Sequence, residues 1–236
     1  MQNTLTIATR QFRSYFNGPV AYIVVVVVML FVGFLFWQPF FLMGRATIRE
    51  MFRFMSWGLV FAAPAISMSL LAEEKRSGTL ELLITMPVRE SEVILGKYFA
   101  SLGLLAVLLL SSVPYPLSVS MLGSLDWGPV VTGYLGLFLE GAAMMAIGIA
   151  ASAWTDNQLV AFFISFAFCF FFIVVGFFLP FMPGGLATLV EWISFEYHFE
   201  SISRGVVDSR DLVFFLSIAV FCVMIAFRAL ESRRWN

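Results

Sequence analysis

The stretch LAEEKRSGTLELLITMPVRESEVILGK, from Leu71 to Lys97, decides how the rest of the chain is organised. It carries nine of the chain's 29 charged residues and lies between two long apolar segments. A charged stretch in that position predicts a connection between two membrane helices, exposed on one side of the membrane.

The middle of this connection has the pattern of a short amphipathic helix that ends at Pro87, since proline cannot continue a helix. At about 100° per residue, one face is apolar and consists of Leu80, Leu83 and Ile84. The other face is mixed and consists of Gly78, Glu81, Leu82 and Thr85. A mixed face suits docking on a protein, and the alternative is an interfacial helix that only joins two spans.

The composition predicts an all-α membrane protein with one transmembrane domain over residues 1–236. Hydrophobic residues make up 61% of the chain and charged residues 12%, with a mean hydropathy of +0.93. The net charge of -1 indicates no class of partner, and the lack of a basic run argues against a nucleic-acid partner. Cys169 and Cys222 both lie inside apolar segments, where packing is their expected role.

Six apolar segments are each near the roughly 20 residues that cross a bilayer as a helix. They are Val20–Met43, Met55–Leu71, Tyr98–Leu122, Val130–Ala153, Leu159–Met182 and Leu212–Leu230. Pro114 and Pro116 are expected to kink the third. Residues 1–18 precede them, and the apolar stripe within Thr4–Phe16 predicts an interfacial helix. No cleavable signal peptide is expected, because the first span is long enough to stay in the membrane.

The distribution of lysine and arginine favours an orientation with both termini in the cytoplasm. That orientation places nine of these residues inside and five outside, and makes residues 72–97 cytoplasmic. The segment 180–211 is then external. Its beginning, broken by proline and glycine, is expected to re-enter the outer leaflet, and the part after Ile193 is expected to be wet.

Arg45, Arg49 and Arg53 conflict with this orientation because they are external. Their spacing of four residues places them on one face of a helix, as an outer extension of the second span. That face either binds an anionic group or is a solvated stripe beside Glu50.

Glu140 lies about ten residues into the fourth span, or roughly 15 Å along a helix. A carboxyl group near the bilayer midplane is costly unless it is paired, protonated or facing water. It lines a substrate route or contacts another helix, or it is a protonated structural group. The small residues that follow, including Gly141 and Gly148, would allow another helix to approach closely.

No catalytic or metal-binding pattern is present in the sequence. His198, the only histidine, has Glu196 and Glu200 close by, which is weak evidence for a metal site. Gly96-Lys97 does not belong to a phosphate-binding loop, because Ser91 occupies the place of the first glycine. We therefore expect no cofactor on this chain, and energy from a gradient or from a partner.

The run from Glu73 to Glu81, followed by Pro87 and Gly96-Lys97, resembles the permease subunit of type-2 ABC exporters. The resemblance implies an elbow helix at Thr4–Phe16, a cytoplasmic coupling helix at Gly78–Pro87 between spans two and three, and a re-entrant segment between spans five and six. It also implies a second permease subunit, with a homodimer as the simplest case, and a cytoplasmic subunit that binds ATP and magnesium. The residues implied to contact that subunit are Glu73, Glu74, Lys75, Arg76, Gly78, Thr79, Glu81, Leu82, Thr85 and Pro87.

A narrower likeness, to the permease of gliding-motility-type ABC transporters, is carried by Phe195–Ser201, Arg204–Asp211 and Ala229–Trp235. It implies a bacterial inner-membrane protein and an auxiliary subunit with a large extracytoplasmic domain. The residues that could contact that subunit are Arg45, Arg49, Arg53, Glu196, His198, Glu200 and Arg204. Two further hypotheses stay open: a scaffold that drives such a partner mechanically without moving a substrate, and an intramembrane enzyme.

Overall fold

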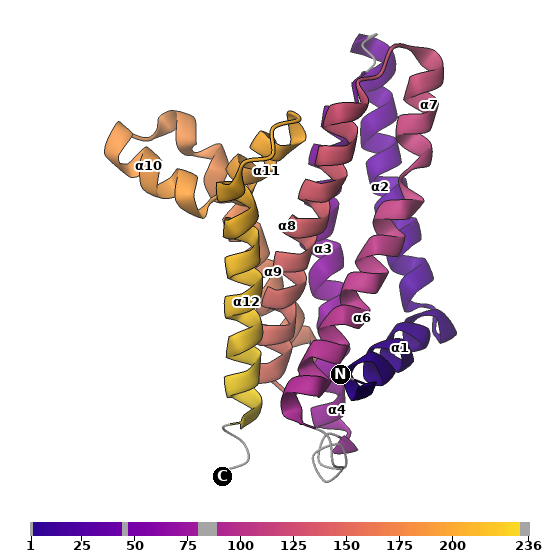
Figure 1. Cartoon of the computed structure of the whole chain (residues 1–236), viewed down its shortest axis with the longest axis vertical. Helices are drawn as coiled ribbons and strands as arrows, with labels where there is room; N and C mark the ends of the chain where they lie inside the picture. Colours follow the sequence, from indigo (N-terminus) through magenta and orange to yellow (C-terminus); the bar gives the residue numbers. More distant parts are fainter. Residues whose placement is uncertain (1, 44–46, 80–88, 232–236) are drawn as a thin grey trace.

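The computed structural model describes residues 2–43, 47–79 and 89–231, and those residues form helices and no strand. Figure 1 shows a bundle of long helices with α1 lying obliquely across one end. The long helices are α2 (Val20–Met43), α3 (Arg49–Ser67), α6 (Glu90–Ser111), α8 (Trp127–Trp154), α9 (Gln158–Phe177) and α12 (Ser209–Glu231). The short ones are α1 (Gln2–Asn17), α4 (Ser69–Arg76), α7 (Pro114–Leu122), the 3₁₀ turn η1 (Leu179–Phe181), α10 (Gly184–Ile193) and α11 (Phe195–Ser203).

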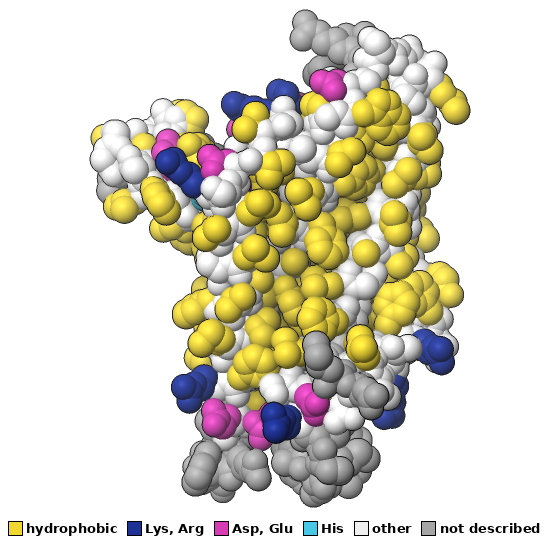
Figure 2. Space-filling model, viewed as in Figure 1, with side chains coloured by type: hydrophobic (Ala, Val, Ile, Leu, Met, Phe, Trp, Pro, Cys, Tyr) yellow, Lys and Arg dark blue, Asp and Glu magenta, His cyan; other side chains and the backbone are white. Residues whose placement is uncertain are grey.

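Six helical stretches among the described residues are long and apolar enough to cross a membrane, as the sequence predicted. Their bounds differ at the polar ends: the second stretch runs from Arg49 to Arg76, whereas the apolar pattern indicated Met55 to Leu71. Charged side chains continue these helices beyond the apolar core because they can reach water there. Figure 2 shows the result on one face, where an apolar belt lies between two charged bands.

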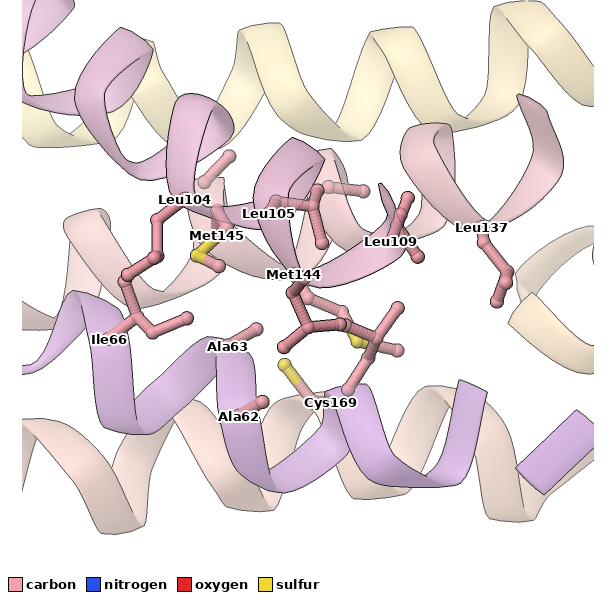
Figure 3. Packing of buried hydrophobic residues seen from close by; sticks show 14 of the residues in the cluster. Ala62, Ala63, Ile66, Leu104, Leu105, Leu109, Leu137, Met144, Met145 and Cys169 are labelled. Carbon is pink, nitrogen blue, oxygen red and sulfur yellow. The ribbon is translucent and has the colours of Figure 1, made fainter. Parts of the chain in front are cut away.

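α8 is the central helix of the bundle. In its most apolar window 83% of the residues are buried, against 22% for α2, α9 and α12. Small residues make this possible: a Cβ atom at Gly141 would lie 2.7 Å from Leu105 of α6, and one at Gly148 would overlap Ser67 of α3. The close approach predicted for this face of α8 is therefore confirmed. Figure 3 shows Met144 and Met145 of α8 packed among Ala63, Leu104 and Leu105.

α3 and α4 run parallel to α8 and stay in register with it over its length. Four successive contacts or hydrogen bonds define this register: Phe52 with Gly133, Ser56 with Glu140, Ser67 with Gly148, and Met68 with Ser152. Glycine and serine at these positions bring the two backbones close together, as small residues do between membrane helices. The second and fourth spans are thus packed as one unit.

The prediction that proline interrupts the third span is confirmed. α6 ends at Ser111, and α7 begins at Pro114, where the missing N–H is no loss because a helix leaves its first N–H groups unpaired. The hydroxyl of Tyr115 donates to the Met29 carbonyl at 2.9 Å, so α7 is fixed to α2.

The part after Ile193, which was expected to be wet, instead packs into the bundle as α11. Phe195, Phe199 and Ile202 recur at helical spacing and are buried, with Phe199 and Ile202 against Gly136 of α8. The preceding helix α10 projects to the side of the bundle (Figure 1). Its Leu189, Trp192 and Ile193 side chains are exposed.

Candidate functional site

The candidate site is the end of the bundle where α4, α8 and α12 end and α6 begins, which we call the base (Figure 1). α4 ends at Arg76, and Gly78 follows with a φ of 70°, in the left-handed region that favours glycine. Gly78 thus forms the turn after α4 rather than part of an amphipathic helix. Glu81, Leu82, Thr85 and Pro87 of the predicted coupling helix lie outside the described residues.

A buried ion pair joins the two sides of the 77–89 connection. The Lys97 ammonium on α6 lies 2.7 Å from the Glu74 carboxylate on α4, and also donates to the Leu70 carbonyl. The Lys97 side chain is only 3% exposed, so its charge depends on these partners. α4 and the first turns of α6 are therefore held together where the connection leaves and re-enters the bundle.

The Ser152 hydroxyl, near the end of α8, forms hydrogen bonds with the backbone at the break between α3 and α4. Its hydroxyl accepts hydrogen bonds from the Leu71 and Ala72 amides at 3.0 and 2.9 Å, and donates to the Met68 carbonyl at 2.9 Å. These backbone groups would otherwise pair within a continuous helix. Lys75 also donates to the Ala153 carbonyl, so α4 is bound to α8 by its backbone and by a side chain.

α1 packs along the first half of α6, and two glycines determine how close it comes. A Cβ atom at Gly96 would lie 2.9 Å from the Thr4 carbonyl oxygen, and one at Gly103 would lie 3.0 Å from the Phe12 ring. At the start of α6, Asn3 donates to the Glu92 carboxylate at 3.1 Å. Gly96 and Lys97 are adjacent in the sequence but contact different helices, α1 and α4.

The six described residues that were expected to contact an ATP-binding subunit fall into two groups. Glu74 and Lys75 are partly buried, and their charged groups are bound within the chain. The exposed residues of the set are Glu73, Arg76, Gly78 and Thr79. Sequence reasoning did not identify Ser152, because a serine in a small-residue run of a span carries no local signal for a bond to a helix 80 residues away.

Glu140 is fully buried and is bonded to the neighbouring helix. Its Oε1 atom accepts a hydrogen bond of 2.7 Å from Ser56 of α3, and among the described residues its Oε2 atom has no hydrogen-bond partner. The helix contact that the sequence analysis gave as one alternative is present, and a role in lining a substrate route stays a prediction. A buried carboxylate with one unpaired oxygen would be costly, which favours the protonated form.

Charged residues at the opposite end of the bundle make local pairs. Arg53 pairs with Glu50 one turn away on α3, and Arg204 pairs with Glu200 of α11. Burial raises the pKa of the Glu196 carboxyl above its ordinary value of 4.5, against the opposing charge of Arg53. Arg49 begins α3, as the expected outer extension of the second span requires, and Arg45 lies outside the described residues.

His198 faces α12 rather than the two glutamates of its own helix. Its Nδ1 atom lies 2.7 Å from Asp211 Oδ1, and its ring stacks on Phe214 with centroids 4.0 Å apart. Within residues 2–43, 47–79 and 89–231 no group of three metal-ligating side chains is found. His198 thus joins α11 to the first turn of α12, and its contacts with Asp211 and Phe214 hold these two helices together.

Comparison with known proteins gives one informative match. A family model described as ABC-2 family transporter protein matches residues 38–219, which run from the end of α2 into α12. No curated protein matches the chain. The matched range includes the ion pair of Lys97 with Glu74, the Ser152 hydrogen bonds and Glu140.

Proposed function

Since the chain belongs to the ABC-2 family of transporter proteins and is the membrane permease of an ABC transporter, we propose that it moves a substrate outward when a separate subunit hydrolyses ATP. The observation that carries the proposal is the base itself, where Lys97 binds Glu74 across the two ends of the 77–89 connection. A force applied to that connection would act on α4 and α6 together.

The contacts of α4 define how such a force would spread. Ser152 and the Ala153 carbonyl bind α4 to α8, while the packing of α3 along α8 continues to the far end of the bundle. Closure of an ATP-binding subunit on ATP would then shift α3, α4, α6 and α8 as a rigid unit against the less buried helices. In this proposal the coupling helix follows the Gly78 turn and ends at Pro87, with Glu73 and Arg76 exposed before it and Thr79 exposed at its start.

The orientation we propose has both termini in the cytoplasm of a bacterium and the base facing the ATP-binding subunit. Nine of the 14 lysine and arginine residues are then cytoplasmic. α1 would be the elbow helix and α10 the re-entrant segment in the outer leaflet, where its exposed Leu189 and Trp192 would meet lipid. ATP and magnesium would be bound by the partner, and two copies of this chain would pair about a two-fold axis.

The experiment that tests the coupling role compares variants in vesicles reconstituted with the ATP-binding subunit. Glu81→Lys reverses a charge on the proposed docking face, and Leu82→Asp replaces the one leucine of that face. Each is expected to lower the permease-dependent ATPase activity at least tenfold and to reduce the amount of ATP-binding subunit that co-purifies, while the permease still inserts in equal amount. Arg210→Ala, at the opposite end of the bundle, is the matched control. Unchanged ATPase activity in both docking variants would reject the assignment.

The second candidate is a permease that acts on a membrane-anchored auxiliary protein, as the likeness to gliding-motility-type transporters implies. The projecting α10 favours it, because Leu189, Trp192 and Ile193 form an exposed apolar surface beside the charged α11. Crosslinks from cysteine placed at position 192 would distinguish the two cases: protein adducts favour an auxiliary subunit, and lipid adducts favour insertion in the leaflet.

A further inference from the structure

A groove at the base lies between the end of α8 and the last turns of α12. Its volume is about 400 Å³, within the range of roughly 300–1,000 Å³ typical of small-molecule sites. Trp154 forms one side, and α12 forms the other with Phe221, Met224, Ile225, Arg228 and Ala229. The groove is open to the surface and has no role in the coupling proposed above.

The lining residues of α12 form a stripe with a polar end. Phe221, Met224 and Ile225 are separated by three and four residues, so they share one helical face. Arg228 continues that face by one further turn, in the last turn of α12. The stripe thus offers about 6 Å of apolar surface from Phe221 to Ile225, followed by one cation.

The two large polar-tipped side chains lie where a membrane interface would place them. Trp154 is 71% exposed at the end of a membrane span, and tryptophan is enriched at this level of a bilayer. The Arg228 side chain is 85% exposed, and its 3.5 Å pair with Glu231 is a surface ion pair, which contributes little. A phosphate could therefore replace Glu231 at small cost.

We propose that this groove binds an anionic phospholipid, with one acyl chain along Phe221–Ile225 and the phosphate against Arg228. The charge at one end and the apolar stripe behind it match the two parts of such a lipid. A second copy of the chain fits less well, because a two-fold contact centred on this face would bring two Arg228 side chains together. The proposal rests on the chain being a membrane protein, and is independent of coupling to ATP hydrolysis.

The test is a lipid titration of the purified full-length protein in detergent, followed by native mass spectrometry. The wild-type protein is expected to bind one phosphatidylglycerol more tightly than phosphatidylcholine of equal chain length. Arg228→Ala is expected to weaken phosphatidylglycerol binding about fivefold, since one basic residue contributes about 1 kcal/mol toward an anionic lipid. Met224→Trp, which fills the groove and keeps the charge, is expected to weaken binding of both lipids.

Arg204→Ala is the matched control, because Arg204 is also an exposed arginine paired with a glutamate, but at the opposite end of the bundle. It should leave phosphatidylglycerol binding unchanged. The proposal is overturned if both arginine variants lose the lipid equally, if the two lipids bind equally to the wild-type protein, or if Met224→Trp has no effect. It is also overturned if Arg228→Ala converts a dimer to a monomer at constant lipid, which would assign the groove to a second copy.

Discussion

Lys97 of α6 lies 2.7 Å from Glu74 of α4, and this pair connects the two helices on either side of the 77–89 connection. Lys97 also donates to the Leu70 carbonyl, so the ion pair is tied to the backbone. A permease that is moved by a separate ATP-binding subunit needs a rigid contact between α4 and α6. If the two helices could move independently, a movement of the 77–89 connection would not be transmitted to the rest of the bundle. The ion pair is therefore expected to contribute both to the stability of the base and to its proposed coupling to the ATP-binding subunit.

Replacing Glu74 is expected to destabilise the protein more than replacing Lys97. Glu74→Ala would leave a cation in a side chain that is 3% exposed, at a cost of about 3–5 kcal/mol. Lys97→Met removes that charge, and the Glu74 side chain, 26% exposed, can still reach water. Denaturant unfolding in micelles would measure both. A loss in Glu74→Ala no larger than in Glu73→Ala, its exposed neighbour, would contradict the prediction.

Ser152→Ala is expected to cost about 1–3 kcal/mol, because the amides of Leu71 and Ala72 would lose their acceptor inside the bundle. Hydrogen exchange at these two amides should accelerate in the variant. Ser165→Ala is the matched control, since Ser165 is also buried and its side-chain hydrogen bond within the described part of the chain is to the Ala161 carbonyl of its own helix. Equal losses in the two serine variants would show that the break between α3 and α4 does not depend on Ser152.

Glu140→Gln is expected to keep the fold and the permease-dependent ATPase activity, because a neutral amide can replace a protonated carboxyl against Ser56. Glu140→Lys would place a cation in the same fully buried position and should abolish stable insertion. Expression in membranes and thermal unfolding test the fold. A stable Glu140→Gln protein without transport would instead assign the carboxylate to a substrate route.

Glu196 predicts a pH dependence of stability, because burial raises its pKa in the folded protein above the ordinary value of 4.5. The folded state then holds this proton more strongly than the unfolded state. The contribution of Glu196 to the free energy of unfolding is therefore full below pH 4.5, the ordinary pKa, and is lost as pH rises through the raised pKa of the folded protein. The charged groups that act on Glu196 are Arg53, Glu200 and Glu50, with Glu140 on the bundle side.

The measurement compares unfolding free energies of the wild-type protein and Glu196→Gln from pH 4 to pH 8, a range of about four units chosen around the ordinary carboxyl pKa. The variant should gain stability relative to the wild type as pH rises. Glu191→Gln on α10 is the control, since Glu191 is not among the charges acting on Glu196. A difference between Glu196→Gln and wild type that does not change with pH would refute the assignment.

The sequence by itself predicted the six membrane helices and the interruption at Pro114, because both follow from local properties. Apolar runs of about 20 residues have one stable form in lipid, and two prolines two residues apart, Pro114 and Pro116, favour a break because neither has an N–H to continue the helix. The close approach at Gly141 and Gly148 was also predictable, since small residues in a span permit it. The burial of α11 could have been found as well: Phe195, Phe199 and Ile202 have helical spacing, which the surrounding polar residues obscured.

Hydrogen bonds and ion pairs between residues that lie far apart in the chain were decided only by the tertiary structure. Nothing near Ser152 indicates that it bonds the backbone at Leu71, and nothing near His198 selects Asp211 over Glu196. The same holds for Glu74, which was expected to contact the ATP-binding subunit and which the fold pairs with Lys97. A hydroxyl, a carboxylate or an ammonium can bond many groups, and which one it meets depends on how whole helices pack. Hydropathy determines that the helices cross the membrane, whereas side-chain shape and register determine which of them touch.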